Sequence, residues 1–261
     1  MSIPLTPTFL GLIVALFLVA GAINGLAGFG FALVGTMVLA IVIEPAVAVV
    51  FVIVPILAVN LSLIGELSAD DLRTCGRRFT PLLVAALLGT VLGMVVLDRL
   101  PTAPLRVGLG VITLAFVLSL QSIVEIPGLA RAKAGCFVES KPAMVGVGGV
   151  SGLLFGGTNV GVQLVAYLRS CDLSHGLFVG VVAMVFLGLN GVRVIAAGAL
   201  GLYPDLTTAG FSVAAAVPAV LGVAVGRRLR SVISERARKI GVLVLLTVIG
   251  VRLVASGLGL F

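Results

Sequence analysis

The fold of this chain is decided by the stretch Gly21-Ala22-Ile23-Asn24-Gly25-Leu26-Ala27-Gly28-Phe29-Gly30. These residues lie inside an uncharged segment that runs from residue 1 to residue 43. As a single helix that segment would be about 65 Å long, which is twice the thickness of a membrane core. Glycine weakens a helix, so this glycine-rich stretch predicts that the helix breaks within the bilayer.

The composition places the whole chain in a membrane. Of its 261 residues, 60% are hydrophobic and only 10% are charged, whereas an average soluble domain carries about 25% charged residues. This excludes a soluble enzyme. The 17 Lys and Arg residues lie mostly in short connections between apolar stretches, where such residues orient the spans, so we expect no nucleic-acid partner. The three cysteines are scattered, and we expect neither a metal site nor a cofactor.

Charged residues divide the chain into pieces of about one membrane span each. A helix needs about 20 apolar residues to cross the hydrocarbon core. After residues 1–43, uncharged stretches follow at 45–65, 79–97, 107–124, 142–168, 176–192, 206–226 and 240–251. The sequence therefore predicts an all-α, polytopic membrane protein of about eight transmembrane spans, surrounded by the lipid bilayer.

The second half of the chain repeats the first. Gly21, Gly25 and Gly30 correspond to Gly148, Gly152 and Gly157 at a constant offset of 127 residues. We therefore expect residues 1–261 to form one transmembrane transporter domain of two homologous four-span repeats, each with a broken glycine-rich first helix. Repeat one covers about 8–122, a connector about 123–141 and repeat two about 142–258. Broken helices at equivalent positions indicate a binding site between the repeats, which are either parallel or inverted.

The broken helices predict an anion site. Irregular backbone at membrane depth lines a cavity or is buried in protein, and a helix that restarts there directs free N–H groups toward that cavity. The candidate binding residues are Asn24, Gly25, Gly28, Gly30, Asn60, Gly152, Gly156, Gly157, Thr158, Asn159, Asn190 and Arg193. Because small residues spaced four apart are also typical of close helix packing, the glycines have two open interpretations.

The distribution of charge supports a negatively charged ligand. All ten carboxylates lie in connections or at the ends of apolar stretches, whereas a cation pathway is expected to hold Asp or Glu within the membrane. Two arginines, Arg193 and Arg252, do lie within apolar stretches. Arg193 follows Asn190 by three residues, so both lie on one helix face. We expect Arg193 either to contact the ligand or to anchor the helix.

An enzyme is the alternative from another class. Gly149-Val150-Ser151-Gly152 has the form found in intramembrane serine hydrolases, and His175 follows it. A nucleophilic serine needs a base within hydrogen-bond reach. Because His175 lies in an expected loop and the first repeat has Asn24 in place of the serine, we expect no catalytic residue.

Several further motifs together resemble one known family. They are Phe31-Ala32-Leu33-Val34, Glu44-Pro45-Ala46-Val47-Ala48, residues 151–157, Leu173-Ser174-His175, Leu189-Asn190-Gly191-Val192-Arg193, Leu221-Gly222, Arg227-Arg228-Leu229 and residues 249–253. In these motifs the chain resembles the sulfite exporter TauE/SafE family of membrane permeases. It departs from that pattern at Thr158-Asn159, where many members carry proline, and at Gly28-Phe29-Gly30, which replaces a glycine triplet.

The resemblance covers essentially the whole chain and implies what the protein carries. It implies a transporter of about eight spans in two homologous halves, whose substrates are sulfur-containing anions such as sulfite, sulfonates or other organosulfur compounds. We expect a multi-pass permease of a prokaryotic cytoplasmic membrane and not an enzyme. A passive anion channel stays an alternative. The direction of transport, the coupling ion and the oligomeric state stay open.

Overall fold

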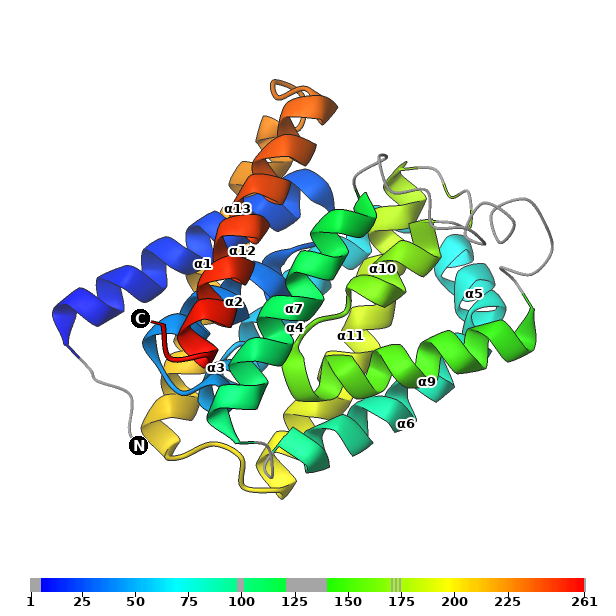
Figure 1. Ribbon diagram of the computed structural model, residues 1–261. Coiled ribbons are helices and arrows are strands. Elements are labelled where there is room, and N and C mark those ends of the chain that lie inside the picture. Colours follow the sequence, from blue (N-terminus) through cyan, green and yellow to red (C-terminus); the bar gives the residue numbers. More distant parts are fainter. Residues whose placement is uncertain are drawn as a thin grey trace.

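The computed structural model describes residues 6–97, 101–120, 140–169, 171, 173 and 175–260, and every regular element among them is a helix (Figure 1). The expected connector at 123–141 lies almost entirely outside these residues. The elements are α1 (Pro7–Ala27), α2 (Phe31–Val42), α3 (Pro45–Phe51), α4 (Ile53–Leu63), the 3-10 helix η1 (Ile64–Glu66), α5 (Ala69–Arg78), α6 (Thr80–Leu97), α7 (Thr102–Leu120), α9 (Lys141–Thr158), α10 (Val162–Arg169), α11 (His175–Ala199), α12 (Leu206–Leu229) and α13 (Glu235–Gly257).

The first glycine-rich stretch breaks the helix, as the sequence predicts. Helix α1 begins at Pro7 and ends at Ala27, and α2 begins at Phe31. Gly28 and Gly30 have φ angles of 82° and 110°, in a region that glycine adopts without steric cost. These two residues therefore turn the chain between the helices.

The second glycine-rich stretch is followed by a similar break. Helix α9 begins after Ser140, whose hydroxyl accepts a hydrogen bond from the Ala143 amide, and it ends at Thr158. Asn159 has a φ of 60°, and among the described residues it is the only non-glycine with a positive φ. The eight-residue α10 begins at Val162. Each broken helix is thus followed by a shorter one.

Glycines bring two pairs of long helices into backbone contact. At Gly21 and Gly25 of α1, an added Cβ would lie less than 3.0 Å from backbone atoms of α12. At Gly152 and Gly156 of α9, it would lie equally close to backbone atoms of α6. Side chains would force these helices apart, so both pairs depend on the glycines for their close packing.

The long helices are apolar enough to cross a membrane. Among the described residues, four helices are long and apolar enough to span the bilayer. A fifth span is possible if α5 and α6, which meet at a bend of 72°, are counted as one. The four spans are α1 (Pro7–Ala27), α3 and α4 taken together (Pro45–Leu63), most of α11 (Gly176–Ala199) and α12 (Leu206–Leu229). This supports a multi-pass membrane protein. The full count of eight spans and the two-repeat arrangement stay predictions.

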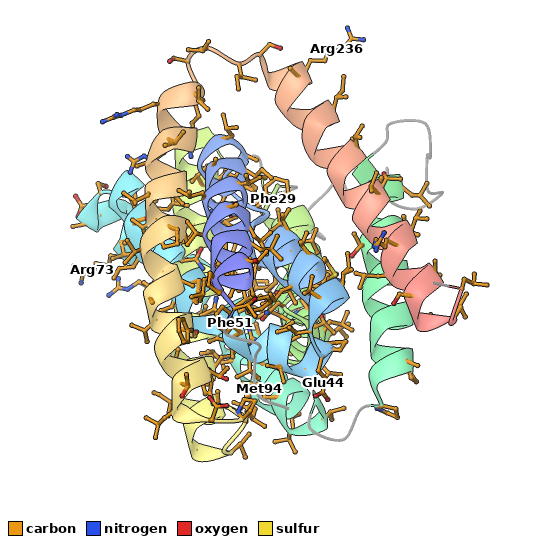
Figure 2. The ribbon with its side chains drawn as sticks, turned by 90° about the vertical axis from the view of Figure 1, so that its left-hand side faces the viewer. Phe29, Glu44, Phe51, Arg73, Met94 and Arg236 are labelled. Atoms are coloured by element: carbon orange, nitrogen blue, oxygen red, sulfur yellow. The ribbon has the colours of Figure 1, made fainter. Side chains whose placement is uncertain are left out.

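The surface fits lipid surroundings. Large apolar side chains such as Leu92 of α6 and Val217 of α12 are exposed. Figure 2 places Arg236 at one end of the molecule and Glu44 toward the other, with Phe29 and Phe51 between them. Apolar side chains in contact with lipid and charges at the ends are what a bilayer requires.

Candidate functional site

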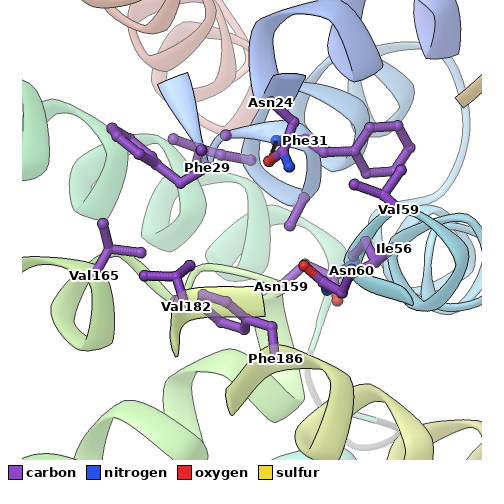
Figure 3. Close-up of a pocket in the computed structure, with 15 residues that line it drawn as sticks. Asn24, Phe29, Phe31, Ile56, Val59, Asn60, Asn159, Val165, Val182 and Phe186 are labelled. Carbon is purple, nitrogen blue, oxygen red and sulfur yellow. Dashed lines mark hydrogen bonds between the residues drawn. The ribbon is translucent and has the colours of Figure 1, made fainter. Parts of the chain in front are cut away.

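A small pocket lies where the two broken helices meet (Figure 3). Its volume is about 40 Å³. Three asparagines supply its polar side chains, so we call it the asparagine pocket; none of its fifteen lining residues is charged. These residues are Asn24, Gly28, Phe29, Gly30, Phe31, Ala32, Leu33, Ile56, Val59, Asn60, Asn159, Gly161, Val165, Val182 and Phe186. The pocket thus includes the breaks after α1 and α9 and one face each of α4 and α11.

Asn24 holds the first break in place. Its side-chain oxygen accepts a hydrogen bond of 3.0 Å from the Phe31 amide, the first of α2. Its backbone carbonyl accepts another, of 2.7 Å, from the Gly28 amide. Asn24 therefore caps α2 from seven residues away and fixes the start of that helix against the pocket.

Asn159 connects the second break to the first half of the chain. Its side-chain nitrogen donates hydrogen bonds of 2.7 Å to the Thr36 hydroxyl and 2.8 Å to the Val49 carbonyl. Thr36 belongs to α2 and Val49 to α3, and Asn159 is fully buried. The Val49 carbonyl can only accept, so it fixes which end of the Asn159 amide faces it. Asn159 thus sets the distance between the two breaks.

Asn60 is the asparagine with an uncommitted side chain. It lies on α4, lines the pocket and is 7% exposed. Its side-chain amide makes no hydrogen bond to another described residue, whereas the side chains of Asn24 and Asn159 each make at least one. In Figure 3, Asn24 lies on one side of the cavity and Asn60 and Asn159 lie on the other. Asn60 can therefore offer both its donors and its acceptor to a ligand.

Two helix N-termini adjoin the pocket. Phe31, Ala32 and Leu33 form the first turn of α2, and Gly161 immediately precedes α10. The first amides of a helix carry a partial positive charge. Asn159 already donates both of its side-chain N–H groups within the protein, so the side-chain donors for a ligand are those of Asn24 and Asn60. With these donors, and without carboxylates in the lining, the helix N-termini make a site suited to a small anion.

The other candidate glycines are occupied by helix packing. Gly25, Gly152 and Gly156 do not line the pocket, and their Cα atoms contact the backbone of a neighbouring helix instead. The carbonyl of Gly25 also accepts a hydrogen bond from the Arg230 side chain. Gly157 faces the backbone of Gly93 on α6. Packing therefore accounts for these four positions, whereas Gly28 and Gly30 do lie at the cavity.

Thr158, Asn190 and Arg193 also lie outside the pocket lining. The Thr158 hydroxyl donates to the Leu154 carbonyl and accepts from the Val160 amide, so it secures the end of α9. The Asn190 amide donates to the Phe186 carbonyl at 2.8 Å and accepts from Arg193 at 3.2 Å. The structure thus places Asn190 beside Arg193 and Thr158 at the end of α9, and none of the three lines the pocket.

The apolar wall of the pocket was not among the predicted residues. Phe186 and Val182 of α11 line it together with Phe29. Phe186 precedes Asn190 by four residues and Val182 precedes it by eight, so Val182, Phe186 and Asn190 share one face of α11. That spacing could have identified Phe186 and Val182 as pocket residues, but aromatic and branched residues are too frequent in this chain for the spacing to distinguish them.

The serine proposed for an alternative enzymatic role is buried in α9. Ser151 is 1% exposed, and it makes no hydrogen bond to another described residue. The side chain of His175 lies outside the described residues. The geometry therefore gives no support to a nucleophile and base pair at this position.

Comparison with known proteins supplies the family. Neither a search of curated proteins nor a search of solved structures returned a match. A family model described as "Sulfite exporter TauE/SafE" matches residues 13–253, which is nearly the whole chain. The match includes the breaks after α1 and α9 and every residue that lines the asparagine pocket. The chain therefore belongs to the sulfite exporter TauE/SafE family of membrane permeases.

Proposed function

We propose that this permease carries sulfite, and that the asparagine pocket is where the anion binds. The observation that carries the proposal is an uncharged cavity with three asparagines beside two helix N-termini. A cavity needs a volume of about 10–15 Å³ to hold one water molecule. A cavity of about 40 Å³ therefore suits a ligand of a few heavy atoms. Sulfite fits that description better than a larger organosulfonate does.

The arrangement of the whole chain belongs to the same proposal. We infer about eight spans in two homologous four-span repeats, in a prokaryotic cytoplasmic membrane. Each repeat contributes one broken helix to the pocket, α1 with α2 and α9 with α10. Binding between two repeats, each able to move against the other, is how many secondary transporters achieve alternating access.

The direct test is flux in liposomes that contain the purified protein. We expect sulfite uptake down a gradient to saturate with concentration and to be inhibited by other small oxyanions more strongly than by bulky sulfonates. A rate that rises without saturation would favour the passive channel. Cation flux without oxyanion flux would contradict the proposal.

Asn60 offers a substitution that separates binding from folding. Asn60→Ala removes a polar group from the pocket without breaking a side-chain hydrogen bond to any other described residue. A hydrogen bond to a charged ligand contributes about 1.5–3 kcal/mol, so we expect the half-saturating sulfite concentration to rise by about tenfold or more. The thermal unfolding midpoint should stay within about 2 °C of wild type.

Ser62→Ala is the matched control for Asn60→Ala. Ser62 lies on the same helix but does not line the pocket, and its hydroxyl donates to the Val59 carbonyl at 2.7 Å. This variant should transport sulfite as wild type does. Unchanged half-saturation in Asn60→Ala would remove Asn60 from the site.

A further inference from the structure

Arg193 is a buried cation whose charge the described protein does not neutralise. The residue is 0% exposed. Its guanidinium donates to the Asn190 side chain at 3.2 Å and to the Gly156 carbonyl at 3.4 Å, and it lies 4.7 Å from the centre of the Phe155 ring. Among the described residues its Nε has no hydrogen-bond partner, and none of their carboxylates pairs with it. An unpaired buried charge is costly and attracts an anion.

The position of Arg193 is related to the pocket by the geometry of α11. Val182, Phe186, Asn190 and Arg193 follow at spacings of four, four and three residues, so they lie along one helix face. Val182 and Phe186 line the asparagine pocket. Arg193 is seven residues beyond Phe186, which is about 10 Å along the helix.

Two aromatic rings stand between the pocket and the guanidinium. Phe186 lines the pocket, and its ring centre is 5.0 Å from that of Phe155. Phe155 in turn contacts Arg193 on its ring face. An anion that moved from the pocket toward Arg193 would therefore have to pass this pair of rings.

A further polar side chain, that of Tyr203, follows the C-terminal end of α11. Tyr203 lies in the connection between α11 and α12, close enough to Arg193 for a charge on one side chain to influence the other. Burial raises the pKa of Tyr203. The phenol therefore stays protonated, and its hydroxyl can donate a hydrogen bond to an anion.

We propose that Arg193 is a second station for the transported oxyanion, between the asparagine pocket and the side of the membrane where α11 ends. This rests on the proposed function. The guanidinium can donate from more than one N–H to an oxyanion, and the Phe155–Phe186 pair separates the two stations. The anion binds first among uncharged donors and then passes the rings to the fixed positive charge.

Two substitutions test whether Arg193 binds the anion: one removes the positive charge, and the other keeps the charge but pairs it within the protein. Arg193→Met removes the charge. Asn190→Asp keeps an oxygen where Arg193 already donates and supplies a carboxylate that neutralises the guanidinium within the protein. We expect sulfite flux to fall by at least about tenfold in each. Arg193→Lys, which keeps a charge, should transport faster than Arg193→Met.

Binding is measured separately, as the sulfite concentration that half-maximally raises the thermal unfolding midpoint. We expect this concentration to stay within about threefold of wild type in both variants, because the pocket is unchanged. Asn190→Asp loses the hydrogen bond to the Phe186 carbonyl and gains a charge pair with Arg193, so we expect its unfolding midpoint to stay close to that of wild type. If Arg193 only secures the end of α9, Asn190→Asp should retain flux.

Arg252→Met is the matched control, because Arg252 also lies in an apolar helix but is exposed. It should transport as wild type does. Flux within about twofold of wild type in Asn190→Asp or Arg193→Met overturns the second station. The second station is also overturned if the half-saturating sulfite concentration in either variant changes in proportion to the flux, because Arg193 would then belong to the asparagine pocket. A wild-type protein without sulfite flux overturns the proposed function itself.

Discussion

Asn24→Asp is expected to stop sulfite flux and leave the fold intact. An aspartate keeps the acceptor that receives the Phe31 amide, which is the one hydrogen bond that the Asn24 side chain makes among the described residues. The N-terminus of α2 favours a negative charge at this position. The cap should therefore survive, and the thermal unfolding midpoint should stay near that of wild type.

The same substitution places a fixed negative charge in the wall of the pocket. At about 4 Å and an effective dielectric constant of about 20, two like charges repel by about 4 kcal/mol. We therefore expect sulfite flux in liposomes to fall by about a hundredfold or more. Because the substitution adds one negative charge and keeps the shape of the side chain, this variant tests whether the pocket holds an anion.

Asn24→Ala is the companion variant for this experiment. It removes the cap of α2 without adding charge, so it should unfold earlier than wild type, by an amount typical of a lost helix cap, about 1 kcal/mol. Flux that survives in Asn24→Asp would contradict anion binding at the pocket. A gain of cation flux in that variant would indicate that the site accepts cations.

The sequence predicted the elements whose cause is local. Glycine-rich stretches inside long apolar segments predict a break. The first break falls on Gly28 and Gly30 of its stretch, and the second begins at Asn159, directly after the last glycine of its stretch. The resemblance to the permease family was correct for the same reason, since its motifs are these glycine patterns. Asn24, Asn60 and Asn159 were also identified, because polar amides are conspicuous in such apolar surroundings.

What the sequence could not predict depends on which helices become neighbours. Gly25 and Gly28 are three residues apart, yet one faces α12 and the other lines the pocket. Asn159 bonds to Thr36 and Val49, both more than 100 residues away. Arg193 was grouped with the asparagines as a ligand contact, but its place behind Phe155 follows from the packing of α9 on α11.

Gly152→Leu is expected to destabilise the protein strongly. Even a Cβ at this position would lie less than 3.0 Å from the backbone carbonyl oxygen of Ala86. Because the obstacle is backbone, α6 and α9 would have to separate along their contact. Overpacking of this kind costs about 1–3 kcal/mol or more, so we expect a fall of about 5 °C or more in the unfolding midpoint. Gly152→Ala should show a smaller fall.

Gly146→Leu is the matched control on the same helix, since a Cβ at Gly146 has no atom within 4 Å. It should keep the midpoint and the sulfite flux of wild type, because its side chain extends toward the lipid. The comparison decides between the two interpretations of the glycine motif. If Gly152→Ala kept the wild-type midpoint but lost flux, Gly152 would be a ligand contact. The contact with Ala86 leads us to expect the reverse: instability first, and loss of flux only in proportion to the protein that fails to fold.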